Sequence, residues 1–300
     1  TLRHLMQDLL RQRGIAPRIL LIDQTPRHEP ATDAFLLEHR DRLVQIRVAE
    51  PNLPNARNVG LEAATGEIIV FIDDDLRVPA GFLEGLVAQF HDPSVDAVAP
   101  LVVVKGEQPP GAFTERYYGF RPDWRSNPRI EVPRVIGACM AFRRSLVLQL
   151  GGSDALMGRL NPSASAEDYE FCGRWTRAGH RLWLTPAVHA VHDGNVAGGC
   201  NMRGLPEADA QLQQLRGATF LVLKEEHSFA RLRARALLRL LRLGVVRRDI
   251  LARGPREWVR AAVRLQRVVQ DVQAFWRSQA LAATRAGEIG DERGAVRRAA

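Results

Sequence analysis

The stretch Ile68–Asp75, which reads Ile-Ile-Val-Phe-Ile-Asp-Asp-Asp, decides the fold of this chain. Four aliphatic residues and a phenylalanine in a row are typical of a buried strand. Three carboxylates follow directly at the carboxyl end of that strand. Because ligands of open α/β sheets bind outside the carboxyl ends of the strands, the stretch predicts an α/β fold with a binding site at Asp73, Asp74 and Asp75.

Carboxylates this close to one another repel unless a positive charge lies between them. A divalent cation with oxygen ligands is the usual solution, and a Mg²⁺-type ion in turn binds the phosphates of a substrate. The triplet therefore favours a metal site that handles a phosphorylated substrate. The alternative is a solvated acidic turn after a core strand, and the stretch alone does not decide between the two.

The composition is that of a globular protein. A length of 300 residues suits one large α/β domain or two smaller ones, and the hydrophobic share of 46% is ordinary. Because the sequence holds no run of 18 or more apolar residues and no signal-peptide pattern, we expect neither a transmembrane helix nor a leader. Cys139, Cys172 and Cys200 are odd in number and lack metal-ligand spacing, which favours free thiols in a reducing compartment.

The positive charge is concentrated near the C-terminus. Residues 230–300 hold 17 arginines and 6 acidic residues, whereas the rest of the chain holds 25 basic and 28 acidic residues. Residues 230–243 and the segment after Pro255 have leucine, valine and tryptophan at helical spacing among the arginines, which predicts basic amphipathic helices. Such helices either pack on the body with a solvated basic face or attach to an anionic membrane surface, and both interpretations stay open.

Helical and strand patterns alternate along the first hundred residues, which predicts a mostly parallel sheet in three layers. The predicted helices are 2–13, 32–42, 55–64 and 80–90, and the predicted strands are 19–23, 44–48, 68–72 and 95–100. A further strand is expected at 135–143, where Gly137 and Ala138 let another group approach the backbone closely. Between them, residues 106–134 are rich in proline, glycine and aromatic residues, and we expect a loop that covers the substrate.

Several short motifs follow one another in a fixed order. They are Asp23 at a strand end, Asn55-Ala56-Arg57-Asn58 at a helix start, the acidic triplet, Gly137-Ala138-Cys139, Leu150-Gly151-Gly152-Ser153-Asp154, Glu167-Asp168 with Arg174, and the late residues His189 and His192. In this order and spacing the set resembles the family 2 glycosyltransferases, which are inverting nucleotide-sugar enzymes with the GT-A fold. The resemblance spans roughly residues 1–192. Each motif alone is weak, and their ordered combination is specific.

The resemblance implies a role for each matching residue. Asp23 corresponds to the aspartate that contacts the nucleotide base, and Arg57 and Asn58 to the helix-opening motif beside the donor. Asp73 and Asp74 belong to the diphosphate-binding motif, and Gly137 and Ala138 are expected to line the donor site. The resemblance places the metal, Mg²⁺ or Mn²⁺, on Asp75 with Asp73 and His192, and makes Asp168 the catalytic base with Glu167 beside it.

The family pattern begins with a strand of the type V-V-I-P-T-Y-N-R, and this sequence starts at Thr1 just after it. We therefore expect an N-terminal truncation that removes part of the donor site. The expected division is a GT-A catalytic domain over 1–205, basic amphipathic helices over 206–286 and a disordered tail over 287–300.

The resemblance and the chemistry together predict an inverting, metal-dependent glycosyltransferase. One carboxylate must deprotonate the acceptor hydroxyl while the leaving diphosphate is neutralised elsewhere, and Asp168 and the triplet meet these two needs. The expected partners are a nucleotide-diphosphate sugar and a carbohydrate or lipid-linked acceptor, in the synthesis of cell-surface polysaccharide or glycolipid. The expected location is the cytoplasm, either free or peripheral at the inner face of the plasma membrane. The alternatives are an incomplete GT-A domain that acts as a scaffold and a nucleic-acid-binding protein. The mildly acidic body disfavours the latter.

Overall fold

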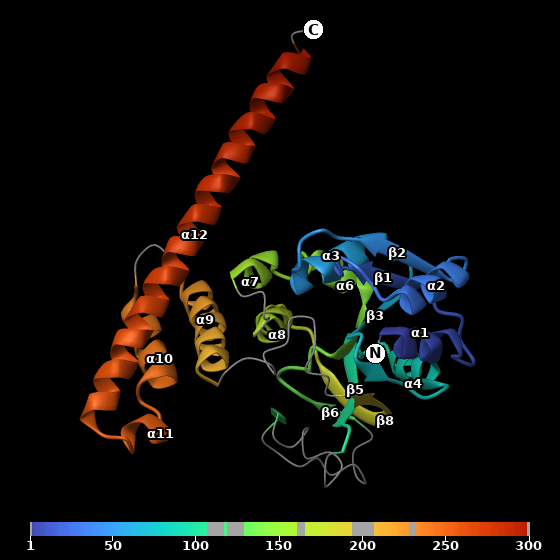
Figure 1. The fold of residues 1–300 in the computed structure, drawn as a ribbon, viewed down its shortest axis with the longest axis horizontal. Helices are drawn as coiled ribbons and strands as arrows, with labels where there is room; N and C mark the ends of the chain where they lie inside the picture. Colours follow the sequence, from blue (N-terminus) through green and yellow to red (C-terminus); the bar gives the residue numbers. More distant parts are fainter. Residues whose placement is uncertain are drawn as a thin grey trace. The chain divides into compact units, whose positions relative to one another are not determined.

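The structure is a computed structural model that describes residues 2–106, 117–118, 129–160, 166–193, 207–227 and 232–298, without the side chains of 207, 208 and 283–298. Within these ranges the chain divides into two compact units, Thr1–Gly204 and Leu205–Ala300. Figure 1 shows strands flanked by helices in unit 1 and helices alone in unit 2. Cys200, and most of the loop predicted over 106–134, lie outside the described residues.

Unit 1 opens with a small parallel sheet. β1 (Ile19–Asp23) pairs in parallel with β2 (Leu43–Arg47), and α2 (Pro30–Glu38) connects the two strands. α1 (Leu2–Leu10) precedes this pair and α3 (Leu53–Ala63) follows it. α3 starts where the Asn52 side chain accepts a hydrogen bond from the backbone N–H of Asn55, with a proline in the first turn, as helix starts favour. The predicted helices and strands of this region are confirmed, with ends that differ by a few residues.

A six-stranded mixed sheet forms the centre of unit 1. Its order is β3 (Ile68–Ile72), β7 (Cys139–Arg143), β5 (Ala97–Val104), β8 (Trp183–His192) and β4 (Leu76–Arg77), with β6 (Ile130–Glu131) also paired to β8. β5 and β8 run parallel, and the other pairs are antiparallel. The expectation of a mostly parallel sheet is therefore wrong for this sheet. A short helical crossover makes successive strands parallel, but β7 follows the long segment after β5 and enters antiparallel between β3 and β5.

Helices cover both faces of this sheet, as Figure 1 shows for α4 (Phe82–Ala88) and α8 (Glu167–Arg177). β7 illustrates how the sequence builds the three layers. Its alternate residues Cys139 and Ala141 join the core under α1 and α4, while Met140 and Phe142 join the core under α8. Since successive residues of a strand point to opposite faces, an apolar run buries both faces. The expected three-layer α/β architecture is confirmed.

α8 is anchored by aromatic packing. The Trp175 side chain is fully buried, its ring packs at 4.9 Å from that of Phe142, and its indole N–H donates to the carbonyl of Arg181 at 3.1 Å. A buried indole with a satisfied N–H fixes both the depth and the rotation of a helix. This anchor holds the first turn of α8, which carries Glu167 and Asp168.

Unit 2 consists of α9 (Glu207–Glu225), α10 (Ala234–Gly244), α11 (Arg248–Leu251) and the long α12 (Pro255–Arg298). α9 and α10 lie along the first half of α12 in Figure 1, and their buried side chains include Phe220, Leu240 and Leu265. α10 and the start of α12 at Pro255 match the predicted amphipathic helices. The backbone is helical to Arg298, in the range where we expect a tail. In the described part of the chain, no helix combines the length and apolarity that a bilayer crossing requires.

Candidate active site

Strand pairing brings the acidic triplet beside the start of β7. Ile72 at the end of β3 is the partner of Cys139, and the ladder continues one step further, where the backbone N–H of Asp73 donates to the carbonyl of Ala138 at 2.8 Å. Residues 65 positions apart in sequence therefore share one edge of the sheet. Asp73 and the Gly137-Ala138 turn therefore lie next to each other in the candidate site.

Gly137 is the meeting point of α3, β7 and α8. The Arg57 guanidinium donates to the carbonyl of Gly137 at 3.1 Å and lies 3.4 Å from Glu167 Oε1. A Cβ atom built on Gly137 would lie 3.2 Å from Arg57 Nη2, 3.4 Å from the Asp168 Cβ and 3.5 Å from Glu167 Oε1. Three side chains thus converge on a position where a Cβ would be tight against Arg57, which explains the close approach predicted there.

The predicted metal ligands meet at the other end of the triplet. Leu76 of β4 pairs with His192 of β8, and this register brings His192 Nε2 to 3.5 Å from Asp75 Oδ2. The backbone N–H of Asp193 also donates to the carbonyl of Asp75 at 3.0 Å. His189, the competing histidine of the sequence, pairs with Leu101 three residues earlier along β8.

The carboxylates of the site strongly influence one another. Burial raises the pKa of Asp73 to about 7, against the opposing charge of Arg57, and Asp75 and Glu167 add to the rise. Burial likewise raises the pKa of Asp168 to about 6, with Glu167 adding to the rise and Arg57 opposing it. A carboxyl group with a pKa near neutrality is suited to accept a proton from a substrate.

α8 begins in a strained conformation directly before these carboxylates. Ala166 adopts φ 80° and ψ 7°, a left-handed conformation that costs a residue with a Cβ about 1 kcal/mol. Glu167, Asp168 and Glu170 then occupy the first turn, where the helix dipole favours negative charge. The predicted acidic pair is therefore positioned by a turn that no pattern in the sequence announces.

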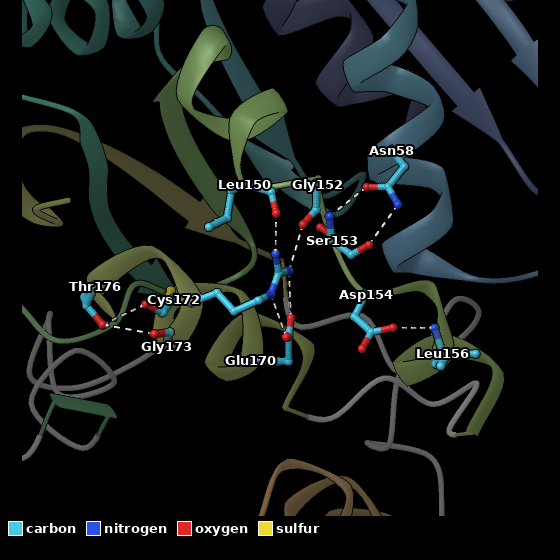
Figure 2. Close-up of polar contacts among 11 residues, drawn as sticks. Asn58, Leu150, Gly152, Ser153, Asp154, Leu156, Glu170, Cys172, Gly173 and Thr176 are labelled. Atoms are coloured by element: carbon cyan, nitrogen blue, oxygen red, sulfur yellow. Dashed lines mark hydrogen bonds and ion pairs between the residues drawn. The ribbon is translucent and has the colours of Figure 1, made fainter. Parts of the chain in front are cut away.

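Asn58 belongs to a second network, which Figure 2 shows. Its amide donates to the carbonyl of Ser153 at 2.8 Å and accepts from the N–H of Ser153 at 2.7 Å. From the other side, Arg174 binds both carboxylate oxygens of Glu170 and donates to the carbonyls of Leu150 and Gly152. The loop 150–154 is thus clamped between α3 and α8, and a role of Asn58 in donor binding stays a prediction.

Asp23 at the end of β1 is buried and surrounded by donors. It accepts hydrogen bonds from His28 at 2.8 Å, from Gln45 at 2.5 Å and from the backbone N–H of Thr25 at 3.0 Å. Burial alone would raise the pKa of Asp23, but these hydrogen bonds outweigh it and lower the pKa. His28 is also close enough to lower the pKa of Asp74, so Asp23 and its partner His28 lie near the triplet. Asp23 makes no hydrogen bond to the triplet among those described. Contact with a nucleotide base stays a prediction.

Two residues of the site were not singled out by the sequence. The Tyr117 hydroxyl lies 3.1 Å from Asp168 Oδ2, and Arg134 donates to the backbone carbonyl of Tyr117 at 2.8 Å. Both belong to the aromatic-rich segment 106–134, so its composition was a signal for the region without identifying the residues.

The donor set suits a hard divalent cation, which prefers oxygen ligands and binds through one or two carboxylates together with substrate phosphates. Asp75 and His192 lie together, and Asp73 is close enough for the charge of Asp75 to add to its raised pKa. No group of three or more metal-binding side chains in mutual reach occurs among the described residues. A cation held here would therefore take part of its coordination from the substrate.

Together, the mixed α/β sheet and the carboxylates at its strand ends have the arrangement of the GT-A class of glycosyltransferases. The chain belongs to glycosyl transferase family 2, whose family model matches residues 1–151. It is 32% identical over 197 residues to the pre-mycofactocin glycosyltransferase of Mycobacterium tuberculosis, covering 64% of this chain and 40% of that protein.

Two further comparisons agree with this assignment. The O-antigen biosynthesis protein RfbC of Myxococcus xanthus is 28% identical over 226 residues, which cover 69% of this chain and 17% of RfbC. The mannosyltransferase PcManGT from Pyrobaculum calidifontis, solved with GDP-Man and Mn²⁺, superposes with a TM-score of 0.54 at 18% identity, over 95% of this chain and 75% of its own. That likeness shows the fold. The chain spans less than half the length of either curated relative.

Proposed function

We propose that this chain transfers a sugar from a nucleotide-diphosphate donor to an acceptor hydroxyl with inversion at the anomeric carbon. The observation that carries the proposal is the convergence on Gly137 of Arg57, Glu167 and Asp168, beside the triplet at the end of β3. The carboxyl group of Asp168, with a pKa near 6, lies there near the acidic triplet, whose charges need a cation to offset them.

In the proposed mechanism Asp168 accepts the proton of the acceptor hydroxyl as that oxygen attacks the anomeric carbon. Glu167 holds the Arg57 guanidinium, and Arg57 offers positive charge to the anionic donor. Asp75, with Asp73 and His192, would hold Mg²⁺ or Mn²⁺, which supplies charge neutralisation for the leaving diphosphate when it is bound. Since one carboxylate acts on the acceptor and the leaving group departs from the opposite face, a single displacement inverts the anomeric configuration.

The test is a panel of UDP-, GDP- and dTDP-sugars assayed for transfer and for slow donor hydrolysis. Asp168→Asn should lower turnover by about 10² or more, the usual scale of a general base, while donor affinity by calorimetry changes little. Glu67→Gln is the matched control, because Glu67 is a highly exposed carboxylate before β3, at the strand end opposite Asp73. NMR of the product anomer decides inversion. Donor binding without transfer or hydrolysis would instead support a catalytically incomplete GT-A domain acting as a scaffold.

We also propose that unit 2 contacts the anionic inner face of a membrane, near a lipid-linked acceptor in polysaccharide or glycolipid synthesis. Residues 232–282 hold twelve arginines and three carboxylates. Large apolar side chains are exposed among them, namely Leu238, Val246, Leu251, Trp258 and Val259. Apolar side chains interleaved with arginine are typical of helices that lie in the lipid interface. The O-antigen relative supports such a pathway.

Vesicle sedimentation tests this contact on the full chain. Vesicles with phosphatidylglycerol should bind it and pure phosphatidylcholine vesicles should bind weakly, with a loss at high salt because screening acts over about 8 Å at physiological ionic strength. Replacing the exposed Arg248, Arg253 and Arg256 by glutamine should weaken binding. Replacing three exposed arginines of unit 1, Arg11, Arg13 and Arg40, is the charge-matched control. Equal loss in both variants, or no binding at low salt, would reduce the arginines of unit 2 to a solvated face.

A further inference from the structure

The hydroxyl group of Tyr117 lies between two acceptors. Its oxygen is 3.1 Å from Asp168 Oδ2 and also 3.1 Å from the carbonyl oxygen of Val135. Val135 is itself fixed to α8, because its backbone N–H points to the Cys172 sulfur at 3.5 Å. The hydroxyl thus bridges the proposed base and the chain that leads into β7.

A tyrosine hydroxyl has one proton to donate and can also accept. When Asp168 is ionised, donation to its carboxylate is the stronger, charge-assisted choice. When Asp168 is protonated, the carboxylic acid donates to the Tyr117 oxygen, and the tyrosine proton turns to Val135. Both protonation states of Asp168 therefore find a hydrogen-bond partner without any movement of the backbone.

Arg134 holds Tyr117 in place. It donates to the Tyr117 carbonyl at 2.8 Å, and its guanidinium lies over the rings of Tyr117 at 5.2 Å and of Tyr169 at 4.7 Å. The Tyr117 and Tyr169 rings also contact each other, with centroids 6.2 Å apart. A cation between two aromatic faces is a favourable and rigid arrangement. Tyr169 directly follows Asp168, so the same cluster fixes both ends of the hydrogen bond.

Tyr117 stays protonated throughout. Burial raises its pKa, and the neighbouring Asp168 carboxylate adds to the rise. The tyrosine is therefore a permanent hydrogen-bond donor and no competitor for the substrate proton.

We propose that Tyr117, held by Arg134, is the positioning residue of the base Asp168, which it orients when ionised and supports when protonated. The inference rests on the proposed function. In the transfer step the acceptor O–H bond breaks and its proton moves to Asp168. The acceptor oxygen bonds to the anomeric carbon, and the bond to the diphosphate oxygen breaks with its electron pair. Protonated Asp168 then donates to Tyr117 while Tyr117 donates to Val135.

Among the described residues, four other groups interact electrostatically with Asp168. Glu167 and Cys172 act from α8 itself, Arg57 acts from α3, and Tyr118 acts from the position next to Tyr117. The N–H of Tyr169 donates to the second carboxylate oxygen, Oδ1, at 2.8 Å. Removing the Tyr117 hydroxyl changes none of these groups, so its effect on the base can be measured separately.

The test is the variant Tyr117→Phe, which keeps the ring over Arg134 and loses only the hydroxyl. Because the lost hydrogen bond stabilises the ionised form, the acidic limb of kcat/KM should move up by about one pH unit. The rate should then be about tenfold below that of the unaltered protein near pH 5 and nearly equal near pH 9. NMR titration of ¹³C-labelled aspartate should show the same upward shift in the pKa of Asp168, and it needs no activity assay. The Asp168 signal is assigned by its loss in Asp168→Asn.

Two further variants make the test sharper. Tyr118→Phe is the matched control, because it removes the hydroxyl of the neighbouring tyrosine, whose ring packs edge-on against Tyr117. It should leave the pH profile unchanged. Arg134→Met should shift the profile in the same direction as Tyr117→Phe, and the double variant should add nothing to Tyr117→Phe if Arg134 acts through Tyr117.

The outcomes separate this inference from the proposed function. If Asp168→Asn abolishes transfer but Tyr117→Phe leaves both the pH profile and the NMR titration in place, Tyr117 is not a positioning residue and the base assignment survives. If Asp168→Asn retains turnover, the assignment of Asp168 as the base fails although transfer itself occurs. In that case the NMR titration of Asp168 still shows whether Tyr117 stabilises the Asp168 carboxylate.

Discussion

Replacing Asp168 by asparagine should stabilise unit 1 above pH 6 while it removes transfer. The reason is the pKa of Asp168, which burial raises from 3.8 to about 6, with Glu167 adding to the rise and Arg57 and Tyr117 opposing it. The folded protein thus binds this proton more tightly than the unfolded chain does. Ionisation of Asp168 leaves the free energy of unfolding unchanged below about pH 4. It lowers this free energy as the pH rises from about 4 to about 6, and the loss stays constant above that range.

The magnitude follows from the size of the rise. At 1.36 kcal/mol per pKa unit, the ionised carboxylate costs roughly 3 kcal/mol of unfolding free energy above pH 6. Asparagine keeps an oxygen for the Tyr117 hydroxyl but cannot also accept from the N–H of Tyr169, and that lost hydrogen bond costs about 1 kcal/mol. The expected net change is a gain of about 2 kcal/mol at pH 8 and a loss of up to about 1 kcal/mol near pH 4, where the lost hydrogen bond is no longer offset.

Urea denaturation followed by tryptophan fluorescence measures the change, and hydrogen exchange in β7 and α8 assigns the transition to unit 1. Glu167→Gln is the control of opposite sign, because it leaves the buried Arg57 without its carboxylate and should cost about 3 kcal/mol. A loss of stability in Asp168→Asn at pH 8, or the same change at pH 4.5 and pH 8, would refute the reasoning that desolvation controls this carboxyl group.

Three further predictions concern single residues of the site. Asp75→Asn should abolish the metal dependence of donor binding with the fold intact, and calorimetry that finds the same donor affinity with and without a chelator would contradict a metal role for Asp75. Gly137→Ala should lower turnover by roughly tenfold, because its Cβ would press on Arg57 Nη2 at 3.2 Å and overpacking costs about 1–3 kcal/mol; unchanged turnover would show that Arg57 can move freely. Ala166→Gly should raise unfolding stability by about 1 kcal/mol, since glycine accepts φ 80° without strain; a lower midpoint in urea would argue against strain at this turn.

The elements that the sequence predicts best are those with a strong local pattern. β1 and β3 occur at Ile19–Asp23 and Ile68–Ile72, as their apolar runs predict. β7 shows the limit of local patterns. Its strand was expected from residue 135, but it begins at Cys139, because Gly137 and Ala138 turn to meet Arg57 and Asp73. The direction of β7 depends on the path of the preceding segment, which leaves no periodic signal.

The site divides in the same way. Asp73, Asp75, Glu167, Asp168 and His192 stand at the ends of recognisable elements, so their approximate places could be predicted, while their roles stay predictions. The Tyr117 contact could not be predicted, because it joins residues 51 positions apart through a segment without periodicity. Ala166 is likewise an ordinary residue in sequence and an exceptional one in conformation, and such conformations are imposed by the surrounding fold.

Arg57 explains why the two parts of the site lie so close together. Its charge opposes the rise in pKa of Asp73 on the proposed donor side and of Asp168 on the proposed acceptor side. If Arg57 were absent, burial and mutual repulsion would favour protonated carboxyls on both sides, which neither accept a proton nor bind a cation well. Its guanidinium lies against Gly137, where a Cβ would be 3.2 Å from Nη2, and it is held there by the Gly137 carbonyl and by Glu167. In the proposed mechanism, a base that must be ionised and a triplet that must bind a cation can therefore share one buried arginine.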